Sequence, residues 1–129
     1  MADEFSPNAK ARVVTQPAAS DRVLDIGPET VRKYADILKR ARTIFWNGPM
    51  GVFEFERFSE GTKAVANIIS EMTGEATTII GGGDTLSAVE KAGVKGKFSH
   101  SSTGGGAMLE LLEGKTLPGI TALTEAAAR

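Results

Sequence analysis

Three consecutive glycines followed by an acid and a hydroxyl form the stretch of this sequence whose residue types could do chemistry. The run Ile79-Ile80-Gly81-Gly82-Gly83-Asp84-Thr85 has the pattern of a strand, a tight turn and the start of a helix near residue 86. A helix N-terminus binds anions because it presents unpaired N–H groups and a partial positive charge. Since a carboxylate repels phosphate, Asp84 suggests a metal ion between the two. A glycine turn with a purely structural packing role is the alternative.

A second glycine triplet follows the next expected strand. The stretch Ser102-Thr103-Gly104-Gly105-Gly106 comes after a strand candidate at 97–101, and the segment 47–54 follows an apolar run at 43–47. In parallel α/β sheets, ligands bind beyond the carboxyl ends of the strands. Two glycine triplets after successive strands are harder to explain by packing than one, so the sequence favours a phosphate-binding edge.

The segments that must position these turns alternate between helical and extended patterns. We expect helices at 28–42, 59–72, from about 86 to 93 and at 107–112, and strands at 43–47, 77–80 and 97–101. This alternation predicts an α/β fold, a three-layer parallel sheet with flanking helices that is Rossmann-like. Weaker patterns predict a short strand at 12–15, a turn at 117–119, an extended piece at 120–123 and a frayed tail at 124–129. Ser59 is a candidate N-cap and Gly114 a candidate C-cap.

Composition narrows the class of protein. The 129 residues have the length of one domain, and 15 basic against 16 acidic residues give a net charge of -1. This balance offers no reason to expect nucleic acid or an anionic membrane as a partner. The chain has no cysteine, which suits a reducing cytosol and excludes thiolate metal sites.

Common nucleotide and hydrolase motifs do not describe the glycine turns. Neither triplet continues into Gly-Lys-Ser/Thr, and neither has the spacing of the dinucleotide fingerprint. No serine lies in a Gly-x-Ser-x-Gly elbow. Taken singly, Glu54 is most simply a surface carboxylate, Asp84 a helix cap, Trp46 a core residue and His100 a structural or hinge residue.

Several longer motifs together resemble phosphoglycerate kinase, and they cover nearly the whole chain in order. Two further matches are a helix entry at 24–28 and a C-terminal end at 109–119. The three motifs that carry most of the resemblance are Trp46-Asn47-Gly48-Pro49-Met50-Gly51-Val52-Phe53-Glu54, Gly81-Gly82-Gly83-Asp84-Thr85 and Ser99-His100-Ser101-Ser102-Thr103-Gly104-Gly105-Gly106-Ala107.

The resemblance implies that residues 1–129 form only the latter part of a C-terminal nucleotide-binding domain. The family's enzyme has two domains, and its N-terminal domain binds 3-phosphoglycerate with a basic patch that includes a catalytic arginine. That substrate domain and the glycine- and lysine-bearing opening of the nucleotide domain have no match here. We therefore expect an incomplete piece of the family's domain, with Met1 at an artificial start.

The resemblance also assigns roles to residues. It implies that Glu54 accepts hydrogen bonds from the ribose hydroxyls, that Val52 and Phe53 lie beside the nucleoside, and that Asn47 lies near the phosphates. Asp84 would bind Mg²⁺, which prefers oxygen ligands. Phosphate oxygens would be contacted by Gly82, Gly83 and Thr85. The helix that faces the transferred phosphoryl group would be opened by Gly104, Gly105 and Gly106, the catalytic residues of the site.

Two functional classes follow. In the first, the chain is part of a cytoplasmic glycolytic kinase that transfers phosphate between 1,3-bisphosphoglycerate and ADP, with Mg²⁺ and ATP/ADP, and is inactive alone. In the second, it is a non-catalytic folded piece that binds nucleotide weakly or associates with itself. An exposed sheet edge with unpaired backbone groups would favour such pairing.

Overall fold

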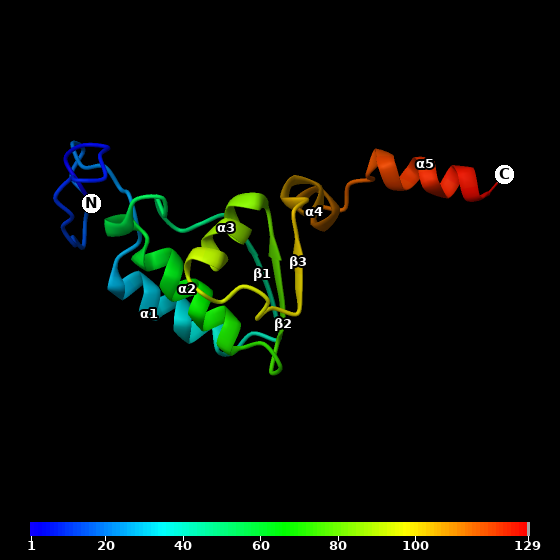
Figure 1. Ribbon diagram of the computed structural model, residues 1–129, viewed down its shortest axis with the longest axis horizontal. Helices are drawn as coiled ribbons and strands as arrows, with labels where there is room; N and C mark the ends of the chain where they lie inside the picture. Colours follow the sequence, from blue (N-terminus) through cyan, green and yellow to red (C-terminus); the bar gives the residue numbers. More distant parts are fainter. Residues whose placement is uncertain (129) are drawn as a thin grey trace.

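A computed structural model describes residues 1–128 and contains a three-stranded parallel sheet with helices around it (Figure 1). The strands are β1 (Thr43–Asn47), β2 (Thr77–Gly81) and β3 (His100–Ser102), hydrogen-bonded in that order. The predicted α/β fold with a parallel sheet is confirmed. The helices are α1 (Pro28–Leu38), the 3-10 turn η1 (Glu56–Phe58), α2 (Glu60–Glu71), α3 (Gly83–Lys91), α4 (Gly105–Leu112) and α5 (Pro118–Ala127).

The main core lies between one face of the sheet and helix α2. Side chains alternate along a strand, so Ile44 and Trp46 of β1 and Ile80 of β2 point to the same side. There they pack with Val65 and Ile69 of α2, all of them buried. Trp46 is 5% exposed, which confirms its predicted place in the core.

The opposite face of the sheet is covered at its carboxyl end by helix α4. Phe45 and Ile79 alternate with the core residues and are only half-buried. At the end of β2, a Cβ built on Gly81 would lie 3.3 Å from the Met108 sulfur of α4 and 3.6 Å from the Phe45 ring. Helices α1, α2 and α3 gather on the other side of the strands (Figure 1).

Helix boundaries differ from the predicted ones by a few residues. Helix α1 ends at Leu38 instead of residue 42. The N–H groups of Arg40 and Ala41 donate to carbonyls three residues earlier, those of Ile37 and Leu38, which is the tighter 3-10 pattern. Helix α3 begins at Gly83, directly after the glycine at its N-cap, and α4 likewise includes two of its glycines. Glycine in the first helical turn weakened the helical signal there, so the sequence placed both starts too late.

Two segments that were predicted to be extended are not, and one predicted N-cap residue does not cap its helix with its side chain. The piece expected at 120–123 is part of helix α5, which begins at Pro118 and continues through helix-forming residues to Ala127. The tail expected to fray is therefore helical to Ala127, and Arg129 lies outside the described residues. Residues 12–15 form no strand. Ser59 occupies the N-cap of α2, but its hydroxyl donates to the Glu56 carbonyl instead of capping the helix.

The N-terminal segment packs as a small separate cluster. Ala2 and Arg22 exchange backbone hydrogen bonds of 3.0 Å, and Arg12 forms ion pairs with Asp3 and Asp21. Ala2 and Leu24 are buried with Phe58 of η1, away from the main core. Within residues 1–128, no helix is long and apolar enough to cross a membrane.

Candidate functional site

The carboxyl ends of the three strands bring the predicted site segments into one row. Asn47, the last residue of β1, is paired in register with Gly81 of β2, and Gly81 is paired with Ser102 of β3. The Gly82 N–H then donates to the Ser102 carbonyl at 2.9 Å. Because the sheet is parallel, both glycine turns and the segment after β1 leave the same edge, as the sequence predicted.

Gly82 and Gly105 hold the two glycine turns against each other. Gly82 has a φ of +92°, which side chains rarely adopt. A Cβ on Gly105 would lie 2.8 Å from the Gly82 Cα and 2.8 Å from the Asn47 amide nitrogen. No side chain fits at position 105, so these two glycines have a packing role at the junction.

The amide of Asn47 lies at this junction. Its Nδ2 is the buried side-chain polar atom that has no hydrogen-bond partner among residues 1–128. Its Oδ1 is 3.3 Å from the position of a Cβ on Gly82. Buried donors are almost always paired, so an unpaired one needs a specific explanation, such as strain, a catalytic role, an ordered water or an ion.

Gly83 and Gly106 differ from these packed glycines because they face open space. A Cβ on either would meet no atom within 4 Å. Both are exposed, as are Gly104 and Asp84. Gly82 is the N-cap of α3, and Asp84 lies in its first turn, so the alternative of Asp84 as the cap residue is wrong. Three glycines and one carboxylate of these turns, namely Gly83, Gly104, Gly106 and Asp84, are therefore exposed to solution.

Thr85 connects the α3 glycine turn to the loop that follows β1, here called the 48–54 loop. Thr85 is fully buried, and its hydroxyl accepts the Gly48 N–H at 2.7 Å. The Trp46 indole N–H donates to the Gly48 carbonyl at 2.6 Å. The loop entry is thus fixed by one core side chain and by the first turn of α3.

The far end of the 48–54 loop is bound to the last turn of the same helix. The Lys91 ammonium donates to the Phe53 carbonyl at 2.7 Å and to the Glu54 carbonyl at 3.3 Å. Phe53 is buried and Val52 half-buried, while Glu54 is exposed. The predicted nucleoside residues therefore lie at one end of α3, and the predicted phosphate and metal residues lie at the other.

Two further side chains hold the middle of the loop. The Thr62 hydroxyl accepts the N–H groups of Met50 and Gly51 at 3.1 and 3.3 Å. Asp25 accepts the Gly61 N–H at the start of α2 and its neighbour's N–H, both at 2.8 Å. A Cβ on Gly51 would approach the Asp25 carboxylate to 2.4 Å. Burial raises the pKa of Asp25 above its ordinary value, although both N–H donors oppose that rise.

Sequence reasoning missed Lys91, Thr62 and the structural role of Asp25. Each acts on backbone groups 11 to 38 residues away. Backbone carbonyls and N–H groups leave no mark in residue type, so no motif could have revealed these anchors.

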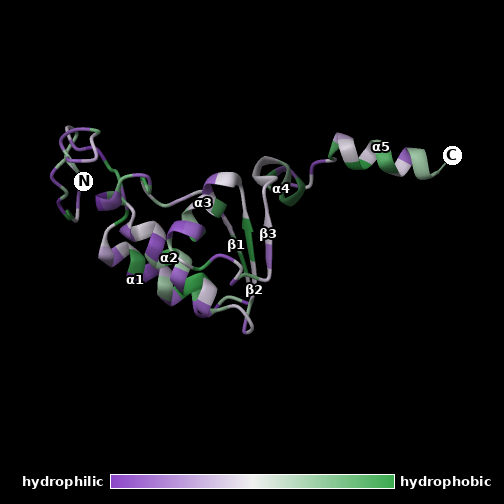
Figure 2. Ribbon diagram, viewed as in Figure 1, coloured by the Kyte–Doolittle hydropathy of each residue, from purple (hydrophilic) through white to green (hydrophobic). Residues whose placement is uncertain are grey.

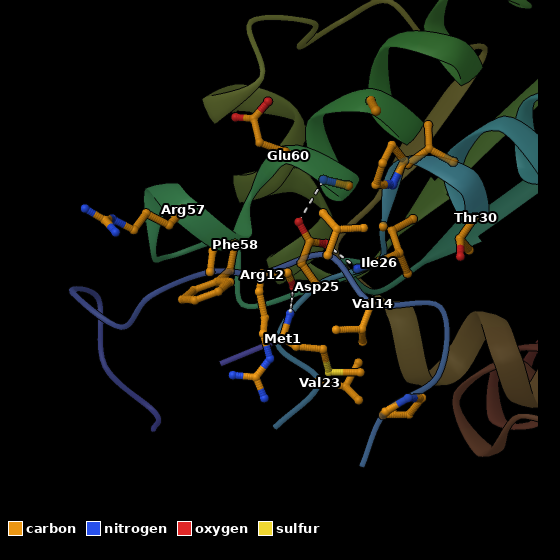
Figure 3. Close-up of a pocket in the computed structure, with 18 of the residues that line it drawn as sticks. Met1, Arg12, Val14, Val23, Asp25, Ile26, Thr30, Arg57, Phe58 and Glu60 are labelled. Atoms are coloured by element: carbon orange, nitrogen blue, oxygen red, sulfur yellow. Dashed lines mark hydrogen bonds between the residues drawn. The ribbon is translucent and has the colours of Figure 1, made fainter. Parts of the chain in front are cut away.

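A sizeable cavity formed by the described residues lies elsewhere. It has a volume of about 810 Å³ and opens between the N-terminal segment and the starts of α1 and α2 (Figure 3). Met1, Val23 and Phe58 contribute apolar walls. Asp25 also lines the cavity and accepts the N–H groups of Gly61 in α2 and of Ile26. None of the predicted site residues lines it. The strand ends are the stronger indication of a site, because they bring together two glycine turns at helix N-termini and the buried, unpaired Asn47 amide.

Among residues 1–128, no three His, Cys, Asp or Glu side chains gather as a metal-binding group. Mg²⁺ in nucleotide sites is usually held by one or two carboxylates together with phosphate oxygens. A single exposed carboxylate such as Asp84 fits that kind of coordination.

These features define a parallel α/β protein in which three strand ends and two glycine-led helix N-termini form one edge. Comparison with known proteins makes this class specific. The family model "Phosphoglycerate kinase" matches residues 1–115, and the chain belongs to the phosphoglycerate kinase family.

Individual relatives agree with this assignment. The chain is 56% identical over 129 residues to "Phosphoglycerate kinase 2, chloroplastic" of Arabidopsis thaliana, covering 98% of this chain and 27% of that protein. It is 54% identical over 129 residues to "Phosphoglycerate kinase, cytosolic" of Triticum aestivum, covering 98% and 32%. The structure of phosphoglycerate kinase from Coxiella burnetii superposes with a TM-score of 0.83 at 48% identity, covering 93% of this chain and 31% of that one.

The chain spans about a third of the length of these relatives or less. The predicted family is therefore confirmed, and the fold is confirmed as incomplete relative to that of the family. The individual site residues stay predictions.

Proposed function

We propose that this chain supplies the Mg-nucleotide side of a phosphoglycerate kinase. In that role it takes part in reversible phosphoryl transfer between 1,3-bisphosphoglycerate and ADP in glycolysis. Residues 1–129 would be the latter part of the nucleotide-binding domain. Family membership supports the reaction, and the row of strand ends supports the location of the nucleotide.

The unpaired amide of Asn47 is the observation that carries the proposal. Its buried Nδ2 lies between the turns that open α3 and α4. Opening of this packed junction would let a phosphate oxygen accept from the Asn47 donor and from first-turn N–H groups of both helices. Two helix N-termini facing one anion would stabilise negative charge that develops during phosphoryl transfer.

The remaining assignments divide along helix α3. Gly82, Gly83 and Thr85 would meet phosphate oxygens, and Asp84 would hold Mg²⁺. Gly104, Gly105 and Gly106 would face the transferred group. At the other end of α3, Val52, Phe53 and Glu54 would bind the nucleoside and ribose. The metal would neutralise phosphate charge when bound, and the protein's own part is to position the nucleotide and exclude water.

Calorimetric titration of the 129-residue chain with Mg-ADP tests the proposal. We expect weak, saturable binding, below that of a complete enzyme because further phosphate contacts lie outside these residues. Asn47→Asp replaces the donor by a negative charge and should abolish binding. Asn67→Asp makes the same change on the exposed face of α2 and should leave binding unchanged. Equal binding by both variants would contradict the proposed site.

Turnover is expected to need more than these residues. By the family resemblance, 3-phosphoglycerate binds a domain outside residues 1–129. The purified chain should therefore show no ATP consumption with 3-phosphoglycerate in a coupled assay. Measurable turnover that Asn47→Asp removes would refute this expectation.

Self-association is a second candidate property, favoured by the sheet order. β1 is an end strand that pairs only with β2 among the described residues. Such an edge can pair with a second copy, and lysine on an edge strand opposes this. Thr43→Lys on β1 should lower the mass measured by light scattering, whereas Thr77→Lys, its register partner on central β2, should not. A monomeric mass at every concentration would exclude the association.

A cytoplasmic location is also proposed. The absence of cysteine and the cytosolic wheat relative support it, while the Arabidopsis relative is named as chloroplastic. Fractionation of the source cells, with detection of this chain in the organelle fraction alone, would contradict it.

A further inference from the structure

Lys91 makes contacts unlike those of the other lysines near the sheet. Its ammonium lies in the last turn of α3 and donates to two consecutive backbone carbonyls, those of Phe53 and Glu54. A third contact is an ion pair of 3.7 Å with Glu56 in η1. An ammonium has three donors, and the two carbonyls use two of them, while the contact with Glu56 is an ion pair longer than a hydrogen bond. Among residues 1–128, Lys95 by contrast pairs only with the exposed Glu90, at 2.9 Å.

Helix α3 therefore holds the 48–54 loop at both ends. Thr85 in its first turn accepts the Gly48 N–H, and Lys91 in its last turn binds the carbonyls at 53 and 54. The two residues are six positions apart, which corresponds to about 9 Å along a helix axis. The helix acts as a rigid spacer between the loop entry and the loop exit.

We propose that Lys91 is a positioning residue that sets the nucleoside end of the site at a fixed distance from its phosphate end. This inference rests on the proposed function, because it gives Lys91 a part in placing the residues expected to bind ribose. Lys91 holds the segment through backbone carbonyls and not through the Glu54 side chain. The Glu54 carboxylate therefore stays available to a ligand while its backbone is fixed.

The surroundings of Lys91 support a specific role over a general charge effect. Glu56 also forms a close ion pair with Lys63, which in turn contacts Glu60 of α2 at 3.3 Å. The ammonium is thus oriented by a carboxylate that α2 also holds. Removing Lys91 would leave the carbonyl of the buried Phe53 without its hydrogen-bond donor, whereas the Val52 N–H would still donate to the Leu24 carbonyl at 2.8 Å. The loss should be confined to the loop exit.

Lys91→Met tests this role, with Lys95→Met as the matched control for loss of one positive charge. Amide hydrogen exchange should become about tenfold faster at Phe53 and Phe55 in Lys91→Met. Exchange at Leu86, in the first turn of α3, should be unchanged. Titration with Mg-ADP should weaken about tenfold, while titration with Mg-pyrophosphate, which lacks the nucleoside, should be unchanged.

The outcomes separate the two proposals. Equal exchange at Phe53 and Phe55 in wild type and Lys91→Met overturns the positioning role. An equal loss of Mg-ADP and Mg-pyrophosphate binding, or the same loss in Lys95→Met, shows a charge effect and also overturns it. If the wild type binds neither ligand, the proposed function fails, and the exchange rates still decide whether Lys91 holds the loop.

Discussion

Helices α3 and α4 both follow a parallel strand through a glycine turn, yet they are anchored to the molecule very differently. α3 buries Thr85, Ala88 and Val89 against the sheet and α2. α4 buries only Gly105, and its Leu111 and Leu112 are 55% and 65% exposed. Figure 2 shows apolar residues on α4 and on the α5 helix beyond it, and α5 buries none of its residues.

The difference teaches that a glycine turn can position a helix N-terminus without fixing the helix. α3 is held along its length, so it can transmit position from the phosphate corner to the 48–54 loop. α4 depends on the contact of Gly105 with Gly82 and Asn47, and on Met108 over the sheet. The N-termini of α3 and α4, the two candidate anion-binding ends, are therefore held differently: α3 by buried side chains and α4 mainly by the packing of glycines.

The largest expected effect breaks the α4 contact. Gly105→Ala places a methyl group 2.8 Å from backbone and should lower the unfolding free energy by about 3 kcal/mol. Gly106→Ala, one residue further, meets no atom within 4 Å and should raise it by about 0.5 kcal/mol, since alanine favours helix. Urea unfolding followed by circular dichroism measures both. Equal effects would show that the glycine junction does not anchor α4.

Truncation of apolar side chains compares the two helices along their length. Val89→Ala in α3 removes a side chain that is 1% exposed and should lower the unfolding free energy by about 2 kcal/mol. Leu112→Ala in α4 removes a larger but exposed side chain and should cost less than about 0.5 kcal/mol. A comparable loss in Leu112→Ala would mean that α4 packs against a partner, such as a second copy, in solution.

The junction between α3 and the loop entry should have an intermediate effect. Thr85→Val keeps the shape of the buried side chain but removes the acceptor of the Gly48 N–H, at an expected cost of about 1.5 kcal/mol. Ser87→Ala removes an exposed hydroxyl that donates to the Gly83 carbonyl and should be nearly neutral. A neutral Thr85→Val would indicate that water replaces the lost acceptor.

Much of this architecture could be predicted from residue patterns, because strands apolar on one or both faces and glycine turns have strong local signals. β1 was predicted with its observed bounds, and the meeting of Asn47 with both glycine turns followed from the parallel alternation. The α5 helix was missed because Pro118 and Gly119 read as a turn, although proline suits a first helical turn. The roles of Lys91 and Thr62 depend on long-range contacts with backbone groups, which have no sequence signature.

The smallest expected effects are electrostatic. The stability contributions of Glu56 and Asp25, which lie near the 48–54 loop, should change with pH in opposite directions. The hydrogen bond and charge of Lys63 hold the pKa of Glu56 below its ordinary value of 4.5. A lowered folded-state pKa contributes stability that is present above pH 4.5 and lost as pH falls through the folded value. The difference in unfolding free energy between wild type and Glu56→Gln should therefore shrink as pH is lowered through this range. Because Glu56 is exposed, solvent screening keeps this contribution small.

Asp25 should show the reverse dependence, since burial raises its pKa above 3.8 in the folded chain. Its contribution is full below pH 3.8 and is lost as pH rises through the folded value. Relative to Asp25→Asn, the wild type should therefore lose stability as pH rises over that interval. Urea unfolding at closely spaced pH values measures both trends. Parallel trends in the two variants would show that global charge, and not these local contacts, governs the acid response of the loop.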